Sequence, residues 1–328
     1  MQIPALRRLR RVFPDAHLTL HTRAWAQGIF EDANFIDEIL TFETSKSKFK
    51  DVFTQAKILR PRNFDLVVLF PNSFESALTA KLANIKTRVG YEKEARGFLL
   101  TDALPIPEWK NQTHEVFYYL NLIAEVEKRF VGAQTLSLDE PQFDLTIRDE
   151  RKTRAQKFLM ENAVDLSKKI IALGVGSTNS RAKRWQAKSY AKLNDKIQFE
   201  LKANVILVGA SDELEVSNEV YEMSEKKPII LTGKTSLAEA AAILGEVDLL
   251  VSNDMGLAHI ASAVGTKTLV IFGPTNPNTT RPWTAEIIYK NVECAPCMLR
   301  DCPIDHRCMT GISADEVFEK AINLLNIK

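Results

Sequence analysis

From about residue 168 onward, short apolar runs alternate with amphipathic helical patterns, and this alternation constrains the fold more than any other feature of the sequence. The runs are apolar throughout, and Gly, Asn or Pro bounds them. Continuous apolar strands are typical of a parallel sheet that helices cover on both faces. The pattern therefore predicts a doubly wound, Rossmann-like domain. Its expected strands are residues 170–173, 204–208, 229–231, 247–252 and 268–272, and its expected helices are residues 187–202, 212–225, 236–245 and 257–264.

The N-terminal half repeats this pattern less regularly. Its expected strands are residues 17–21, 36–42 and 65–70, and its expected helices are residues 3–13, 23–31, 73–83 and 113–128. The first helix starts almost at Met1, so the strand and glycine turn that should precede it look absent. A chain of 328 residues that is 45% hydrophobic exceeds one ordinary core. We expect two α/β domains, residues 1–150 and 151–328, joined by a hinge near residues 145–168, with a last helix at residues 313–327 that could cross back.

The charge and hydropathy patterns exclude several classes of protein. The 43 Lys and Arg residues nearly balance the 42 Asp and Glu residues, and a net charge of +1 does not suggest a nucleic-acid-binding protein. No apolar stretch approaches the roughly 18 residues that a membrane-spanning helix needs. The first residues place basic side chains after a short apolar stretch, which is the reverse of a secretory signal. We therefore expect a soluble, cytoplasmic protein.

The strongest local signal lies at residues 251–259, which read VSNDMGLAH. A buried strand ends there in a turn that opens a helix, and ligands of open α/β sheets bind beyond the carboxyl ends of the strands. The backbone N–H groups of Gly256, Leu257, Ala258 and His259 would form an anion site suited to a diphosphate. Asp254 would instead accept hydrogen bonds from sugar hydroxyls. The alternative is that Asp254 caps the helix and His259 is a packed side chain.

A second candidate segment, residues 170–185, is a strand followed by a loop rich in Gly, Ser and Thr. Ser177 and Thr178 could donate hydroxyl hydrogen bonds to phosphate oxygens, and Lys183 could supply a positive charge. The segment lacks the complete glycine fingerprint of a dinucleotide site and is not a P-loop. Its alternative interpretation is a flexible basic loop before a helix.

Two further strand ends should lie in the same region of this domain. Glu213 could hold a ribose diol, although an ordinary acid in the first turn of a helix explains it equally well. Thr275 could contact a phosphate, or its turn could simply end a strand. No two Asp residues are separated by one residue, so the Asp-x-Asp element that binds a divalent cation in many sugar-nucleotide transferases is absent. Lys183 and backbone amides would then stabilise a diphosphate leaving group without a metal.

All four cysteines lie within fifteen residues, which does not resemble a scattered disulfide framework. The spacing allows a structural metal site but lacks paired Cys-x-x-Cys elements. Reduced packing cysteines, a structural metal and disulfides all stay open, and His306 lies nearby. The four residues are Cys294, Cys297, Cys302 and Cys308.

In the N-terminal domain, polar and basic residues follow an apolar strand. They could bind an anionic acceptor, whereas a run of solvated charges is the alternative explanation. The candidates are Asn72, Ser73, Arg88, Lys93 and Arg96.

Taken together, these segments resemble the lipopolysaccharide heptosyltransferases of glycosyltransferase family 9, and most closely their type II members. The matching segments occur in the same order over nearly the whole chain. They are residues 69–77 (LFPNSFESA), 182–185 (AKRW), 251–259, 272–275 (FGPT), and the cysteine segment from Cys294 to Cys308 with His306.

The resemblance implies a GT-B fold, in which two Rossmann-like domains face a cleft, and an inverting, metal-independent enzyme of Gram-negative bacteria. It would transfer L-glycero-D-manno-heptose from ADP-heptose to Kdo-lipid A or a heptosylated inner core, at the cytoplasmic face of the inner membrane. By position, Lys183 would bind the diphosphate and Asp254 the heptose hydroxyls. The amides of residues 256–259 would contact the phosphates.

The sequence departs from the family pattern at its start. Family members open with a strand and a Gly-Asp turn whose Asp is the expected general base, and neither is found before the first helix here. No other residue is nominated as the base. A catalytically impaired nucleotide-sugar-binding module and a sugar-nucleotide epimerase of similar architecture are therefore kept as alternatives.

Overall fold

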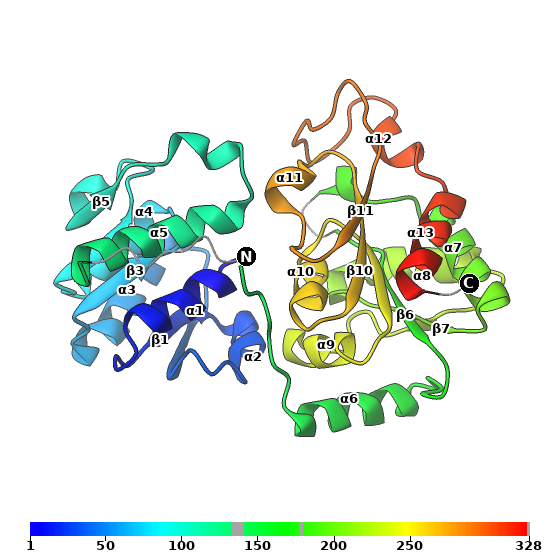
Figure 1. Cartoon of the computed structure of the whole chain (residues 1–328), viewed down its shortest axis with the longest axis horizontal. Helices are drawn as coiled ribbons and strands as arrows, with labels where there is room; N and C mark the ends of the chain where they lie inside the picture. Colours follow the sequence, from blue (N-terminus) through cyan, green and yellow to red (C-terminus); the bar gives the residue numbers. More distant parts are fainter. Residues whose placement is uncertain (133–140, 178–179, 327–328) are drawn as a thin grey trace. The chain divides into compact units, whose positions relative to one another are not determined.

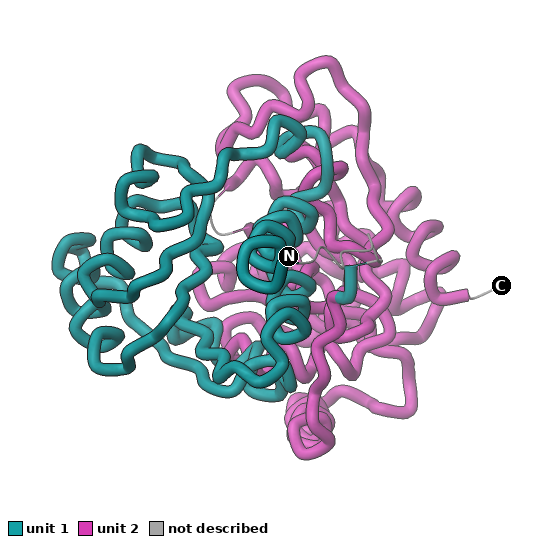
Figure 2. Tube along the Cα trace, turned by 60° about the vertical axis from the view of Figure 1, so that its left-hand side comes forward, with its two compact units in different colours: residues 1–142 teal, residues 143–328 magenta. Residues whose placement is uncertain are grey.

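The structure is a computed structural model that describes residues 1–132, 141–177 and 180–326. It divides into two compact units, residues Met1–Gln142 (unit 1) and Phe143–Lys328 (unit 2), which Figure 2 shows in different colours. The division falls before the boundary expected at residue 150. The reason is an extended segment in which Phe143, Leu145 and Ile147 are buried, and the Leu145 N–H donates to the Ala263 carbonyl at 2.7 Å. This segment is therefore part of unit 2.

Unit 2 contains a parallel sheet with the strand order β11-β10-β9-β6-β7-β8. The helices α9 and α10 lie on one face of this sheet, and α7, α8 and α13 lie on the other (Figure 1). The predicted doubly wound domain is confirmed, and β11 is an addition to the expected strands. The strands are β6 (Ile170–Gly174), β7 (Asn204–Leu207), β8 (Ile229–Ile230), β9 (Leu249–Asn253), β10 (Lys267–Phe272) and β11 (Glu286–Tyr289). The helices are α6 (Asp149–Glu161), α7 (Ala187–Glu200), α8 (Leu214–Met223), α9 (Leu237–Leu244), α10 (Gly256–Ala263), α11 (Pro277–Thr280), α12 (Arg307–Thr310) and α13 (Ala314–Leu325).

The strand order locates the topological switch point of the sheet in unit 2. The chain runs from β6 outward to β7 and β8, then returns to place β9 on the other side of β6. The connections after β6 and β9 therefore leave the sheet in opposite directions. A crevice opens at such a switch point, beyond the carboxyl ends of the two strands, and ligands of doubly wound folds bind there.

Unit 1 has parallel strands in two separate sheets, β1-β2 and β3-β4-β5. The helices α1 and α5 pack together against β3 and β4 through Leu9, Tyr118 and Leu122, whereas α3 and α4 pack together on a second core cluster. That a strand is missing before α1 stays a prediction. The elements are α1 (Ile3–Val12), β1 (Thr19–Arg23), α2 (Gln27–Phe30), β2 (Glu38–Phe42), α3 (Lys48–Leu59), β3 (Leu66–Leu69), α4 (Phe74–Leu82), β4 (Thr87–Tyr91), β5 (Asp102–Leu104) and α5 (Glu115–Phe130).

Several elements of the structure differ from the sequence expectations, and β5, like β11, was not predicted. The helix α3 was not predicted, although Phe49, Val52, Phe53, Ala56 and Leu59 follow the spacing of one helical stripe. The strand β4 occupies part of the segment that we interpreted as a charged run. The helix α13 packs against α7, β9 and β10 of unit 2, whereas the sequence allowed it to cross back. Within the described ranges, no helix is both long and apolar enough to span a bilayer.

Candidate functional site

Three of the predicted residues meet at the carboxyl ends of the strands in unit 2. The Lys183 Nζ lies 2.7 Å from Asp254 Oδ2, and the Thr275 hydroxyl donates to the same oxygen at 2.8 Å. Lys183 comes from the short 3-10 helix η5 (Arg181–Lys183), Asp254 follows β9, and Thr275 follows β10. Since β9 ends at the switch point, this cluster lies where the topology predicts a ligand.

The same contacts decide between the two interpretations of Asp254. The N-cap residue of α10 is Met255, and no side chain caps this helix. The Asp254 side chain is only 8% exposed, whereas the Lys183 side chain that pairs with it is 27% exposed. Asp254 is therefore a buried carboxylate with a cation on its solvent side, and it is not a helix cap.

The sequence analysis missed Asn253, the residue just before Asp254. Its side chain is fully buried, and its Oδ1 accepts hydrogen bonds from the backbone N–H of Trp185 at 2.9 Å and from the Tyr190 hydroxyl at 3.1 Å. Its Nδ2 donates to the carbonyls of Val175 and Gly176 at 3.0 and 2.9 Å. These four bonds use the full capacity of the amide. Asn253 thus fixes the loop after β6 and the start of the segment after Lys183 against β9.

Glu213 lies at the carboxyl ends of β6 and β7, and only 2% of this residue is exposed to solvent. Its Oε2 accepts the Ala210 N–H at 3.0 Å. A Cβ atom placed on Gly176 would lie 2.1 Å from the Glu213 carboxyl carbon, so only glycine fits at residue 176. The structure therefore brings Glu213 against the Gly176–Ser177 loop, although it also engages the backbone at its own helix start, as the structural alternative expected.

The other predicted residues of this region differ in how accessible they are. Ser177 is buried, and its carbonyl accepts two hydrogen bonds from the Arg184 guanidinium at 3.3 and 3.2 Å. Thr178 lies outside the described residues. The Ala258 N–H already donates to the Met255 carbonyl at 3.2 Å, and Leu257 is buried. Gly256 is exposed with open space around it, and His259 is half-buried.

The cysteine segment holds the turns that carry Lys183 and Thr275. The Ala182 N–H donates to the Arg300 carbonyl at 2.9 Å, and the His306 ring nitrogen Nε2 contacts the Ala182 carbonyl. The Met298 N–H donates to the Pro274 carbonyl at 2.8 Å. One segment therefore contacts the residues next to both Lys183 and Thr275. The sequence did not predict that the cysteine segment contacts both turns.

The four cysteines are free thiols. Burial, and then the neighbouring thiols of Cys294, Cys302 and Cys297, raise the pKa of Cys308. In the part of the chain that the structure describes, no group of three or more His, Cys, Asp or Glu residues is placed to hold a metal ion. A structural metal at these cysteines was one of the open alternatives, and it stays untested.

In unit 1, the structure separates the candidate acceptor residues. Asn72 and Ser73 follow β3 at its carboxyl end, whereas the Arg88 guanidinium donates to carbonyls of Ile85, Lys86 and Leu99 near the other end of β4. Because opposite ends of a parallel sheet are a strand length apart, Arg88 does not join Asn72 and Ser73. Lys93 is exposed.

Arg96 is fully buried rather than presented to a ligand. Its Nε donates to the Tyr91 carbonyl at 2.9 Å, its Nη1 to the Pro71 carbonyl at 2.5 Å, and its Nη2 to Asn72 Oδ1 at 3.3 Å. Burial lowers the pKa of this guanidinium. Arg96 holds the turn after β3 in place and orients Asn72, whose Nδ2 donates to the Tyr118 hydroxyl at 3.0 Å.

Comparisons with known proteins agree with this architecture. The family model of "Glycosyltransferase family 9 (heptosyltransferase)" matches residues 52–307. A lipooligosaccharide heptosyltransferase 2 of Campylobacter jejuni is 27% identical, with 99% of this chain and 94% of the relative covered. The solved structure of the Escherichia coli ADP-heptose LPS heptosyltransferase II has a TM-score of 0.82 at 23% identity, with 99% and 94% covered. A family 9 glycosyltransferase of Veillonella parvula has a TM-score of 0.84 at 22% identity, with 100% and 93% covered.

A doubly wound unit joined to a second parallel α/β unit, together with the structural match, defines a GT-B-type fold, and the family match makes the chain an enzyme of the glycosyltransferase class. The family model covers well over half of the chain. The chain belongs to glycosyltransferase family 9, the heptosyltransferases. The resemblance inferred from the sequence is thereby confirmed.

Proposed function

We propose that this protein transfers heptose from ADP-heptose to the inner core of lipopolysaccharide, with inversion at the anomeric carbon and without a divalent cation. The observation that carries the proposal is the convergence of Lys183 and Thr275 on Asp254 at the switch point of unit 2. The family match and the names of the relatives, which are heptosyltransferases of lipooligosaccharide or lipopolysaccharide, support heptose as the transferred sugar.

Each residue of this cluster has a role in the proposed reaction. The partly exposed Lys183 ammonium binds the diphosphate and stabilises the negative charge that develops on the leaving ADP. The Asp254 carboxylate accepts hydrogen bonds from heptose hydroxyls, since a second negative charge would repel the phosphates. The Thr275 hydroxyl holds Asp254 in this orientation. Glu213 lies at the neighbouring strand ends, where a ribose diol would be held.

The proposal needs no metal ion to neutralise the diphosphate. Asp-x-Asp does not occur anywhere in the sequence, so that cation-binding element is lacking. Lys183 and the N–H groups at the start of α10, including that of the exposed Gly256, offer a cation and backbone dipoles instead. Preorganised donors of this kind replace the Lewis acid of metal-dependent transferases.

Unit 1 would bind the acceptor, and Asn72 with Ser73 is the candidate contact. Arg96 acts on this contact only through the position of Asn72. The acceptor would be Kdo-lipid A or a heptosylated inner core, reached at the cytoplasmic face of the inner membrane. No residue of the chain is assigned as the general base.

Calorimetric titration with ADP-heptose tests the donor site. In Lys183→Met, the loss of a charge-assisted hydrogen bond should weaken donor binding about 10- to 100-fold. The matched control is Lys188→Met, which removes an exposed lysine on the first turn of α7 and should leave the affinity unchanged. Thr275→Val, which keeps the side-chain shape, should also weaken binding. Equal affinity in Lys183→Met and Lys188→Met would contradict the proposed site.

Transfer is tested with Kdo-lipid A or heptosylated acceptors, with and without EDTA. The proposal expects a heptosylated product of inverted anomeric configuration, read by NMR, at a rate that EDTA does not change. Binding of ADP-heptose without transfer would instead identify a binding module. Turnover of the donor without any acceptor would identify an epimerase. The family match favours neither of these alternatives.

A further inference from the structure

Two aromatic side chains project from α3 of unit 1 into solvent. Phe49 is 72% exposed and Phe53 is 60% exposed, and their spacing of four residues puts them on one face of the helix. The adjoining flank of α3 buries Val52, Ala56 and Leu59 in the core of unit 1. The buried residues therefore anchor the helix, and the rings of Phe49 and Phe53 at the edge of this apolar stripe stay exposed to solvent.

The two exposed rings lie in a strongly basic part of the chain. Residues 43–62 contain six basic residues and two acidic ones, so this segment has a net charge of +4, whereas the whole chain has +1. Of the two acids, Asp51 accepts hydrogen bonds from the Ser45 N–H with both carboxylate oxygens, at 3.0 and 2.9 Å. Its charge is therefore engaged by the turn that precedes α3. The basic residues are Lys46, Lys48, Lys50, Lys57, Arg60 and Arg62.

A third exposed ring lies at the same end of unit 1. Phe98 is 70% exposed, and its ring lies 6.2 Å from the Phe74 ring at the start of α4. The salt bridge of 2.9 Å between Lys48 and Glu75 joins the first turn of α3 to the first turn of α4. Phe49, Phe53 and Phe98, with Lys46, Lys48 and Lys50, are called here the basic aromatic face. It adjoins Ser73, the N-cap of α4 and a candidate acceptor contact.

We propose that the basic aromatic face docks on the surface of an anionic lipid bilayer. Lysines bind the negative surface, and phenylalanine rings insert at the boundary between headgroups and acyl chains. The choice of a lipid surface rests on the proposed function, because the acceptor of that reaction is itself anchored in a bilayer. Docking by this face would bring the turn at Asn72 and Ser73 close to the headgroup region.

Charge argues against a second copy of the chain as the partner. A two-fold dimer through this face would place the same basic segment against itself, and like charges would repel. An anionic bilayer instead supplies the opposite charge over a wide surface together with an apolar layer for the rings. The face offers both features at once.

Vesicle sedimentation with the full chain tests the proposal without acceptor or donor. The protein should bind vesicles containing phosphatidylglycerol and should bind pure phosphatidylcholine vesicles much less. The double variant Phe49→Ser/Phe53→Ser should lose about tenfold or more in vesicle affinity. Lys46→Glu/Lys50→Glu should lose a similar factor at low salt.

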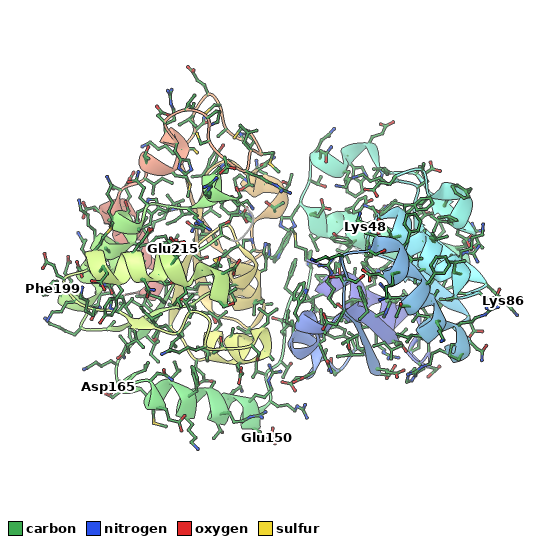
Figure 3. All side chains as sticks on the ribbon, turned by 180° about the vertical axis from the view of Figure 1, so that it is seen from behind. Lys48, Lys86, Glu150, Asp165, Phe199 and Glu215 are labelled. Carbon is green, nitrogen blue, oxygen red and sulfur yellow. The ribbon has the colours of Figure 1, made fainter. Side chains whose placement is uncertain are left out.

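The matched control is Phe199→Ser in unit 2. Phe199 is also exposed, at 43%, and the Lys226 Nζ lies 5.2 Å from its ring. Figure 3 labels it together with Lys48, which marks the start of α3. This variant should bind vesicles like the unchanged protein. Equal vesicle affinity of Phe49→Ser/Phe53→Ser and Phe199→Ser would overturn the proposal.

Two further measurements separate this proposal from the proposed function. Transfer to a delipidated, water-soluble acceptor should be the same in Phe49→Ser/Phe53→Ser as in the unchanged protein, since these residues lie outside the donor site. If vesicle binding depends on these rings but no acceptor is heptosylated, the role of the basic aromatic face is supported and the proposed function is wrong. If the variant abolishes self-association in sedimentation velocity rather than vesicle binding, the face is a dimer interface and the proposal is wrong. Binding to RNA in place of vesicles would overturn it equally.

Discussion

The two units use the polar residues at the ends of their parallel strands in different ways. In unit 2, Lys183 and Thr275 both contact Asp254, and the lysine stays partly exposed to solvent. In unit 1, the corresponding basic residue, Arg96, is completely buried and holds the backbone of its own turn. The comparison teaches that a basic residue after a strand indicates a ligand only where its charge remains accessible. Burial, which the sequence does not display, decides between the two roles.

The largest expected effect concerns the buried amide beneath the site of unit 2. Asn253→Asp would turn a carboxylate oxygen toward the carbonyls of Val175 and Gly176, which now accept hydrogen bonds from the Asn253 Nδ2. A buried charge without a counter-charge should destabilise unit 2 by about 3–5 kcal/mol. Hydrogen exchange of the amides of β6 and β9, with denaturant unfolding, measures this loss.

The control for that change is Asn278→Asp on an exposed position of α11, which should alter stability by less than about 0.5 kcal/mol. If Asn253→Asp were tolerated equally well, the site of unit 2 would not depend on a preorganised polar network, and the contrast with unit 1 would weaken.

A smaller effect is expected from Arg96→Lys in unit 1. An ammonium cannot span the carbonyls of Tyr91 and Pro71 and the Asn72 side chain that the guanidinium now bridges. The loss of these bonds should cost unit 1 about 2–3 kcal/mol. Faster hydrogen exchange confined to β3 and β4 would show it.

The exposed Lys93 provides the comparison for Arg96, since Lys93→Arg should change stability by less than about 0.5 kcal/mol. A variant Arg96→Lys with unaltered exchange but lower affinity for the acceptor would reverse our interpretation. Arg96 would then be a ligand-binding residue, and the two units would resemble each other at their strand ends.

The smallest effect compares two helix caps, one in each unit. Ser236 caps α9 in a capping box, in which its hydroxyl and N–H both donate to Glu239 Oε2, at 2.7 and 2.8 Å. Ser47 caps α3 through the Lys50 N–H alone, at 3.4 Å. Near neutral pH, Ser236→Ala should cost about 1 kcal/mol and Ser47→Ala about 0.5 kcal/mol.

The pH dependence of the two caps should differ as well. Hydrogen bonds from the Ser236 N–H and hydroxyl lower the pKa of Glu239. Because its folded-state pKa lies below the unfolded value of about 4.3, this contribution is complete above that pH and is lost as the pH falls through the folded-state pKa. The cost of Ser236→Ala should therefore shrink in acid, whereas that of Ser47→Ala should not. Equal pH profiles in urea unfolding would contradict the capping-box assignment.

Sequence reasoning worked best where strand, turn and helix are contiguous. The segment at residues 251–259 contains the end of β9, its turn and the start of α10, so local patterns were sufficient to predict its position in the sheet. Asn253 escaped notice because its partners Tyr190 and Val175 lie 63 and 78 residues away, and no local pattern encodes such contacts. An Asn at the end of an otherwise apolar strand was the available signal.

In unit 1 the same reasoning failed at α3 and at Arg96. At α3 the helical spacing of Phe49, Val52, Phe53, Ala56 and Leu59 was the available signal, and only the structure shows that the two rings at the edge of this stripe stay exposed. Arg96 lies in a segment rich in charge, and only tertiary packing shows that its guanidinium is enclosed. Both failures occur where side chains depart from the usual rule of apolar inside and charged outside, as expected at positions with a special role.

The bond between Lys183 and Asp254 has a consequence for the release of product. When ADP draws the lysine toward its phosphates, Asp254 loses one of its two bonded partners and keeps Thr275. The heptose of an intact donor supplies replacement hydroxyls, whereas ADP alone supplies none, and a buried carboxylate left short of partners is costly. On the proposed function, the site should thus bind ADP-heptose with higher affinity than ADP. Inhibition of the enzyme by its own product would then be weak.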